Sequence, residues 1–231
     1  TALDIFFPPI CSVCLKSLVA REKEKNICES CFSKIQIESA LTCPVCRARL
    51  AENKKTCHPN ASYRLAAASN YGEPTVKTLI WRLKYEKRAA AARPLAAVLL
   101  KHLELLPLNL SVFTVLIPMP LHRARERERG FNQSQLLAEA VNQKLGRSVA
   151  AGALLRIKHS APQAEAKDFD ERRENMKNSF LVKNPKLVEN KNIILVDDVF
   201  TSGATMNEAV KSLKENGALK ILGLVAAKAG F

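Results

Sequence analysis

One thirteen-residue segment near the end of the chain constrains the fold more than any other feature of the sequence. It runs from four apolar residues, Ile193 to Val196, through Asp197 and Asp198 to a small, hydroxyl-rich turn that ends at Thr205. An apolar run of this length is typical of a strand that is buried on both faces. A buried strand followed by a polar turn and a helix is the unit from which parallel α/β sheets are built.

Other parts of the 231-residue chain repeat this alternation of strand and helix patterns. We expect Thr205 to cap a helix that ends before Gly217, because hydroxyl residues favour helix starts and glycine favours helix ends. The sequence therefore predicts a mostly parallel α/β sheet. Further helices are expected at 93–106 and 133–145, and further strands at 112–117 and 221–226.

The two acids and the turn have complementary chemical uses. Asp197 and Asp198 would lie at the carboxyl end of a parallel strand, where open α/β sheets bind ligands, and carboxylates accept hydrogen bonds from vicinal ribose hydroxyls. Thr201 to Thr205 offers backbone N–H groups, hydroxyls and Gly203 at the positive end of a helix dipole. The segment therefore predicts a site for a sugar phosphate.

This segment resembles the phosphoribosyl pyrophosphate (PRPP) binding motif of type I phosphoribosyltransferases. It departs from that motif at Ala204, where many such proteins have a second Gly. The resemblance implies a phosphoribosyltransferase-like fold, PRPP as ligand with Mg²⁺ on its pyrophosphate, and catalytic roles for Asp197 and Asp198. The residues expected to contact PRPP are Asp197, Asp198, Val199, Phe200, Thr201, Ser202, Gly203, Ala204, Thr205, Pro120 and Leu121.

A run of arginines at every second position follows Pro118-Met119-Pro120-Leu121. A departing pyrophosphate needs cations, and arginine can hold phosphate oxygens with two N–H groups, so we expect Arg129 to take a catalytic part. Two interleaved glutamates leave open the alternative of a solvated loop that pairs with itself. The run comprises Arg123, Arg125, Arg127 and Arg129.

A narrower resemblance lies around the same run. Pro118-Met119-Pro120-Leu121 followed by Arg129-Gly130-Phe131-Asn132-Gln133 is similar to the signature of the ComF competence-protein family. The likeness runs from Cys11 to the end of the chain, and it implies a double zinc ribbon fused to a phosphoribosyltransferase-like domain. It also implies a role in handling DNA taken up in natural transformation, with other competence proteins as partners. Further matching pieces, in that family's order, are Leu83-Lys84-Tyr85, Gln163, Arg172-Arg173-Glu174-Asn175 and Phe180.

All seven cysteines precede residue 58, mostly in pairs with two residues between them, which is the spacing of structural zinc sites. One thiolate site would use Cys11, Cys14, Cys28 and Cys31. A second would use Cys43, Cys46 and Cys57, but Asn60 stands where the family pattern suggests a fourth cysteine. His58 could complete a Cys3His site, although ligation by neighbouring residues 57 and 58 is awkward. A degenerate second ribbon and a crossed pairing of the cysteine pairs stay open.

Sparse apolar side chains around the cysteines predict a zinc-ribbon domain at 1–60 and a phosphoribosyltransferase-like domain at 61–231. Lys and Arg exceed Asp and Glu by 14 over the whole chain, with nine bases against six acids in 1–60 and 27 against 16 in the remainder. Such a charge attracts polyanions. No run of eighteen apolar residues and no secretory signal is present in the sequence, so we expect a cytoplasmic protein without a membrane span.

The segment 77–93 is the most basic stretch, with six Lys or Arg and one acid around Trp81. Cations beside an aromatic ring can bind single-stranded DNA, although a core position is commoner for Trp. The bases are Lys77, Arg82, Lys84, Lys87, Arg88 and Arg93.

Two hypotheses follow from these patterns. The first is a PRPP-binding competence protein that acts on single-stranded DNA. The second is an active phosphoribosyltransferase that transfers phosphoribose to a nitrogen nucleophile, for which the sequence identifies no acceptor site.

Overall fold

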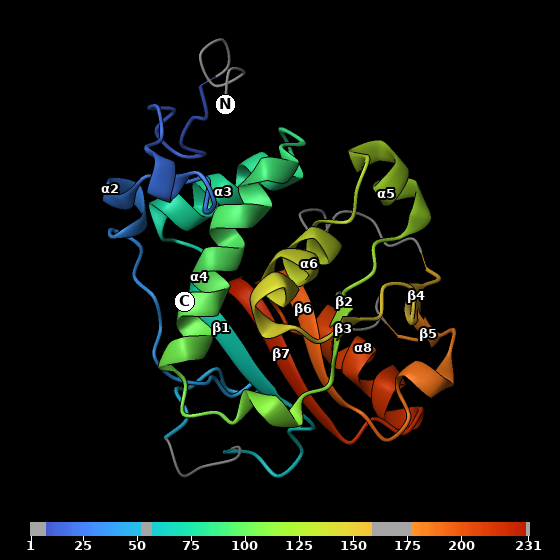
Figure 1. Cartoon of the computed structure of the whole chain (residues 1–231). Helices are drawn as coiled ribbons and strands as arrows, with labels where there is room; N and C mark the ends of the chain where they lie inside the picture. The colour runs from blue at the N-terminus through green and yellow to red at the C-terminus, as the bar shows by residue number, and fades with distance from the viewer. Residues whose placement is uncertain (1–7, 52–56, 159–176, 230–231) are drawn as a thin grey trace.

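The computed structural model describes residues 8–51, 57–158 and 177–229. Five strands form one parallel sheet in the order β1-β7-β6-β2-β3, and a separate antiparallel pair joins β4 to β5 (Figure 1). The α/β prediction with a mostly parallel sheet is therefore confirmed. The strands are β1 (Arg64–Asn70), β2 (Val115–Pro118), β3 (Ser148–Val149), β4 (Leu154–Arg156), β5 (Phe180–Val182), β6 (Asn192–Phe200) and β7 (Lys220–Lys228).

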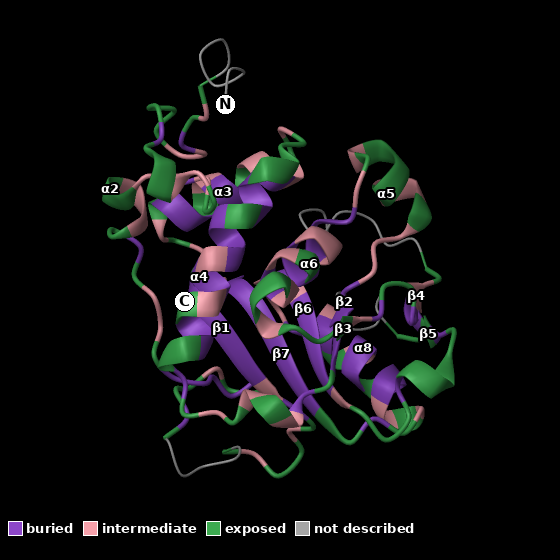
Figure 2. Ribbon diagram, viewed as in Figure 1, coloured by how far each residue is buried: buried purple, intermediate pink, exposed green. Residues whose placement is uncertain are grey.

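Helices cover both faces of the sheet. The core on one face is made with α3, α4 and α6, and the core on the other is made with α8 and the β4–β5 pair. Figure 2 shows β6 and β7 buried between these layers. The α-helices are α2 (Glu29–Phe32), α3 (Pro74–Lys84), α4 (Ala92–Leu105), α5 (Arg123–Arg129), α6 (Gln133–Leu145) and α8 (Ala204–Glu215). Short 3-10 turns are η1 (Ala20–Glu22), η2 (Ala89–Ala91), η3 (Leu110–Val112) and η4 (Pro185–Leu187).

The chain reverses its direction across the sheet between β2 and β6. From β2 it proceeds outward to β3, whereas from β6 it proceeds the other way to β7. Beyond Pro118↔Val196 the strand β6 pairs with β7 only, because β2 has ended. Open α/β sheets bind ligands at such a switch point, outside the carboxyl ends of the strands.

Sequence periodicity predicts the strongest elements well. The helix expected at 133–145 has those bounds, and the helix expected at 93–106 spans Ala92–Leu105. The strand expected at 193–196 is longer, because its hydrogen bonds to β7 continue to Phe200. The strand expected from 112 begins at Val115, since η3 occupies the residues before it.

The N-terminal segment packs onto the sheet domain. Ile27, Ile35 and Leu41 belong to the same hydrophobic cluster as Leu79 and Leu99, which lie on α3 and α4. A bridge between Thr42 and Leu65 adds this segment to the edge of β1. We retain 1–60 and 61–231 as the proposed division of the chain. In the part of the chain that the structure describes, no helix has the length and apolarity needed to cross a bilayer.

Candidate functional site

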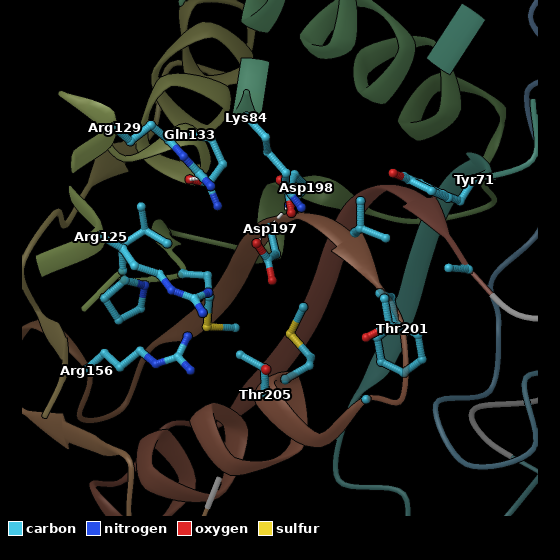
Figure 3. Close-up of a pocket in the computed structure, with 18 of the residues that line it drawn as sticks. Tyr71, Lys84, Arg125, Arg129, Gln133, Arg156, Asp197, Asp198, Thr201 and Thr205 are labelled. Carbon is cyan, nitrogen blue, oxygen red and sulfur yellow. Dashed lines mark hydrogen bonds and ion pairs between the residues drawn. The ribbon is translucent and has the colours of Figure 1, made fainter. Parts of the chain in front are cut away.

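The two acids of β6 lie at the switch point and have different partners. Asp198 is 3% exposed, and its Oδ2 lies 2.8 Å from Nζ of Lys84 at the end of α3 (Figure 3). Asp197 Oδ1 accepts hydrogen bonds of 2.9 Å from the Ser134 hydroxyl and from the Asp198 N–H. Lys84 and Ser134 therefore hold the acid pair from two helices on the same face of the sheet.

Burial and mutual repulsion give these groups unusual protonation. Desolvation and the neighbouring Asp198 raise the pKa of Asp197 to about 7, against the opposite effects of Lys84 and Ser134. Burial alone lowers the pKa of Lys84, but the Asp198 and Asp197 carboxylates outweigh it and raise this pKa above its ordinary value. Lys84 is thus a fixed cation, whereas Asp197 titrates near neutral pH.

A cavity of about 340 Å³ opens in front of the acid pair. Ser202 and Ala204 do not line the cavity. Instead, they contact each other, since the Ser202 hydroxyl accepts a hydrogen bond of 3.3 Å from the Ala204 N–H. The cavity wall also includes Tyr71 and Tyr85, neither of which the sequence predicted to contact PRPP. Of the residues predicted to contact PRPP, those that line it are Pro120, Leu121, Asp197, Asp198, Val199, Phe200, Thr201, Gly203 and Thr205.

The turn after β6 requires glycine at one position. Gly203 has a φ of 84°, and a Cβ placed there would meet the Phe200 ring at 2.8 Å. Gly203 is also the N-cap of α8, which begins at Ala204, so the predicted cap at Thr205 is wrong by two residues. The left-handed conformation of Gly203 starts the helix early and leaves Thr205 inside its first turn.

The arginine run forms a short helix, α5, rather than a loop. Residues four apart share a helix face, so Arg125 and Arg129 line the cavity, whereas Arg123 and Arg127 do not. Arg156 from β4 joins them, and its pKa is lowered by burial and by Arg125. In Figure 3 these three arginines lie on one side of the acid pair, and Thr201 lies on the other.

The residues between α5 and α6 explain the spacing of the signature around them. Gly130 ends α5 with a φ of 86°. Asn132 caps α6 by accepting from the Ser134 N–H, and its amide donates to the Met119 carbonyl at 3.1 Å. Because the Met119 N–H donates to the Val196 carbonyl at 2.8 Å, this loop is tied to β6. Arg129 also donates to the Gln133 side chain. The matching positions Gln163 and 172–175 lie outside the described residues.

The cysteines gather in two groups of four ligands, with the pairs uncrossed. In the first group the Sγ atoms of Cys14 and Cys28 are 3.7 Å apart, and the group is Cys11, Cys14, Cys28 and Cys31. Two sulfurs bound to one tetrahedral Zn²⁺ at about 2.3 Å each lie about 3.8 Å apart, so these residues fit the metal. The buried Cys11 sulfur also accepts N–H groups from Val13 and Cys28, which favours its thiolate.

The second group includes the histidine that the sequence left undecided. His58 Nδ1 lies 3.5 Å from the Cys43 sulfur and 3.2 Å from the Cys57 sulfur, and Cys46 lies 3.3 Å from Cys57. All four ligand atoms lie within 4.8 Å of one another, so neighbouring residues 57 and 58 can share one metal. A Cys3His set fits a closed structural zinc site.

The basic segment 77–93 divides between three environments. Lys84 points to Asp198 rather than to solvent, which corrects its assignment to a DNA surface. Arg82 donates to the Ser12 carbonyl at 2.6 Å and Arg88 pairs with Glu86 at 2.8 Å, so both are engaged within the protein. The residues of this segment that are exposed and basic include Lys77, Lys87 and Arg93.

Fold and site together define a phosphoribosyltransferase-like domain joined to a pair of cysteine-rich metal clusters. The comparisons agree: residues 148–229 match the phosphoribosyl transferase domain family, and residues 2–60 match the double zinc ribbon domain family.

Individual relatives narrow this class. DNA utilization protein YhgH of Escherichia coli O157:H7 is 32% identical over 216 residues, which cover 92% of this chain and 87% of the relative. Competence protein F of Haemophilus influenzae is 30% identical over 209 residues, 86% of this chain and 88% of the relative. Competence protein ComFC of Bacillus subtilis is 38% identical over 103 residues, 45% of this chain and 39% of the relative. The chain therefore belongs to the ComF family of competence and DNA utilization proteins.

Proposed function

We propose that the cavity binds PRPP, with Asp197 and Asp198 on the ribose hydroxyls and the segment 201–205, hereafter the phosphate turn, on the 5′-phosphate. The observation that carries the proposal is the placement of an acid pair at the switch point between this turn and three arginines. Vicinal hydroxyls need paired acceptors, and phosphates need N–H groups and cations. PRPP presents both within one molecule.

The carboxylates have unequal parts in this proposal. Lys84 pairs with Asp198, which is 3% exposed, whereas Asp197 is less deeply buried, so Asp197 is the more accessible acid for a ribose hydroxyl. Arg125, Arg129 and Arg156 would take the pyrophosphate, since guanidinium groups hold phosphate oxygens with paired N–H groups. Mg²⁺ bound to that pyrophosphate would add charge neutralisation, and it needs few protein ligands because phosphates and water supply the rest.

Calorimetric titration of PRPP with Mg²⁺ into the whole protein tests this proposal. We expect saturable binding that ribose 5-phosphate and pyrophosphate each compete for, because each fragment fills part of the same cavity. Failure of either fragment to compete would contradict the proposed division of the cavity, and absence of PRPP binding would reject the ligand.

A transferase activity is the second candidate, and it is favoured by the acid pair and the three arginines that line one cavity. A carboxyl with a pKa of about 7 can exchange protons with an acceptor at neutral pH. In this reading Asp197 and Asp198 stabilise positive charge on the ribose, and Arg129 stabilises the departing pyrophosphate. Release of pyrophosphate in the presence of a nitrogen nucleophile would support it.

We also propose that the protein acts on single-stranded DNA in natural transformation, in the reducing cytoplasm where thiolate clusters persist. The names of its relatives support a DNA role. Trp81 and Tyr85 are 49% and 65% exposed, with ring centroids 6.1 Å apart, and Lys77 lies one turn before Trp81 on α3. These three residues offer stacking faces and positive charge to a single DNA strand. The stripe that they form reaches the cavity, because Tyr85 lines the cavity wall.

The DNA proposal is tested by measuring oligonucleotide affinity from low to moderate salt. We expect affinity to fall steeply with salt, because counterions are released from the phosphates. A Lys77→Glu, Trp81→Ala double variant should bind DNA more weakly and PRPP normally, whereas a Lys101→Glu variant, at an exposed position of α4, should leave DNA binding nearly unchanged. A flat salt dependence would leave PRPP chemistry as the function.

A further inference from the structure

The leading cysteine pair of each cluster, Cys11/Cys14 in the first and Cys43/Cys46 in the second, forms the same backbone turn. In the first, the Leu15 N–H donates to the Cys11 carbonyl at 3.0 Å, and in the second the Arg47 N–H donates to the Cys43 carbonyl at 2.8 Å. The residue after each pair has a positive φ, 63° at Leu15 and 62° at Arg47. Glycine favours this conformation, and residues with side chains rarely adopt it.

The two side chains have different surroundings. Leu15 is 49% exposed. The Arg47 guanidinium carbon lies 5.9 Å from the centroid of the Phe200 ring, and its Nη1 donates to the Ala229 carbonyl at 3.3 Å. Phe200 and Ala229 line the cavity and Arg47 does not, so Arg47 supports the cavity wall from behind.

The Phe200 ring in turn touches the phosphate turn. It is 2% exposed, and a Cβ on Gly203 would lie 2.8 Å from its Cζ. The Phe200 carbonyl accepts from the Ala229 N–H at 2.8 Å, which fixes the same pair of residues that Arg47 contacts. A displacement of the ring would therefore move Gly203 and the start of α8.

We propose that Arg47 is a positioning residue through which the second cysteine cluster holds the phosphate turn in its ligand-binding conformation. The cluster fixes the backbone of Arg47, Arg47 fixes the Phe200 ring, and the ring fixes Gly203. Zinc at this cluster thereby sets the affinity of the cavity for sugar phosphates. The inference rests on the proposed function in one respect, that the phosphate turn receives the 5′-phosphate.

An Arg47→Gly variant isolates the side chain, because glycine relieves the positive φ and keeps the cysteine turn intact. Leu15→Gly is its matched control in the other cluster. Zinc content should equal that of the wild type in both variants. PRPP affinity should fall about fivefold to tenfold for Arg47→Gly, the range of a partly desolvated cation–π contact. Hydrogen exchange of the amides of 201–205 in the ligand-free protein should be faster for Arg47→Gly and unchanged for Leu15→Gly.

Wild-type affinity and wild-type exchange in Arg47→Gly would overturn the proposal, as would loss of zinc from that variant or an equal effect of Leu15→Gly. Faster exchange of the turn in Arg47→Gly, combined with no PRPP binding by the wild type, would support the positioning role and reject PRPP as the ligand. The two failures are therefore distinguishable.

Discussion

The two sides of the cavity are built in different ways. The acid side, Asp197 and Asp198, belongs to a buried central strand and is held by Lys84 and Ser134. The arginine side, Arg125, Arg129 and Arg156, comes from a seven-residue helix with no buried residue and from a three-residue strand (Figure 2). In the proposed binding mode, the sheet presets the geometry for the ribose, whereas the pyrophosphate site relies on charge carried by peripheral elements.

The largest effect is expected from loss of the first metal cluster, because the acid side of the cavity depends on that cluster. Arg82 on α3 donates to the Ser12 carbonyl between Cys11 and Cys14, and α3 also presents Lys84 to Asp198. A Cys28→Ser variant should lose one zinc equivalent and much of its solubility, because metal binding and folding are coupled in small zinc modules. Metal analysis should find two equivalents in the wild type, and a folded, metal-free wild type would refute the zinc assignment.

Removal of both acids should abolish PRPP binding. The Asp197→Ala, Asp198→Ala variant loses charged hydrogen bonds worth about 1.5–3 kcal/mol each, so affinity should fall by more than roughly a hundredfold. Calorimetry checks the affinity. Thermal unfolding of the two single variants compares the contributions of the two acids to stability. Asp198→Ala should be less stable than Asp197→Ala, because it removes the ion-pair partner of Lys84. Equal stability of the two single variants would contradict the unequal roles given to them.

Single arginine changes should have intermediate effects that are specific to pyrophosphate. Arg129→Ala or Arg156→Ala should weaken pyrophosphate binding about tenfold, the size of one lost charge-assisted contact, and change ribose 5-phosphate binding less. Arg123→Ala and Arg127→Ala are matched controls, since they lie on α5 but do not line the cavity. If Arg123→Ala or Arg127→Ala weakened pyrophosphate binding as much as Arg129→Ala does, the overall charge of α5, rather than the position of each arginine, would determine binding.

The smallest effect is expected from pH. Asp197 accepts a ribose hydroxyl best when ionised, and its pKa is about 7, so PRPP affinity should fall as pH falls from 8 to 6, by at most about tenfold over the two units. Its pKa is raised from 3.8, so the folded state binds the proton more tightly than the unfolded state. Stability should therefore decline as pH rises from about 4 to about 7.

An Asp197→Asn variant provides the comparison for both pH curves. It cannot titrate, so the part of each curve that comes from Asp197 should vanish, and the part that comes from the phosphates of PRPP should remain. Identical curves for the variant and the wild type would assign the titration to another group.

The sequence predicted the acid side better than the arginine side, for physical reasons. The segment 193–205 carries its own strand, turn and helix signals, so local chemistry was enough to locate it. Strand β1 was missed because it contains three consecutive alanines, which are poor indicators of a strand. Helix α5 was open to a loop interpretation because its arginines alternate with glutamates.

Contacts between distant parts of the chain could not be predicted from local patterns. Lys84 is read from the sequence as a surface base, and only the packing of α3 against the sheet brings it to Asp198. Arg156 joins the cavity through the position of β4, without any motif of its own. His58 likewise became a candidate fourth ligand of the second cluster only through its position, with its ring beside Cys43.

A crystal structure of the whole protein soaked with PRPP and Mg²⁺ would test the proposed PRPP site. We expect ribose hydroxyls within hydrogen-bond distance of Asp197, the 5′-phosphate on the backbone N–H groups of the phosphate turn, and the pyrophosphate facing Arg125, Arg129 and Arg156. Density for PRPP outside this cavity, or with its ribose away from Asp197, would contradict the proposal.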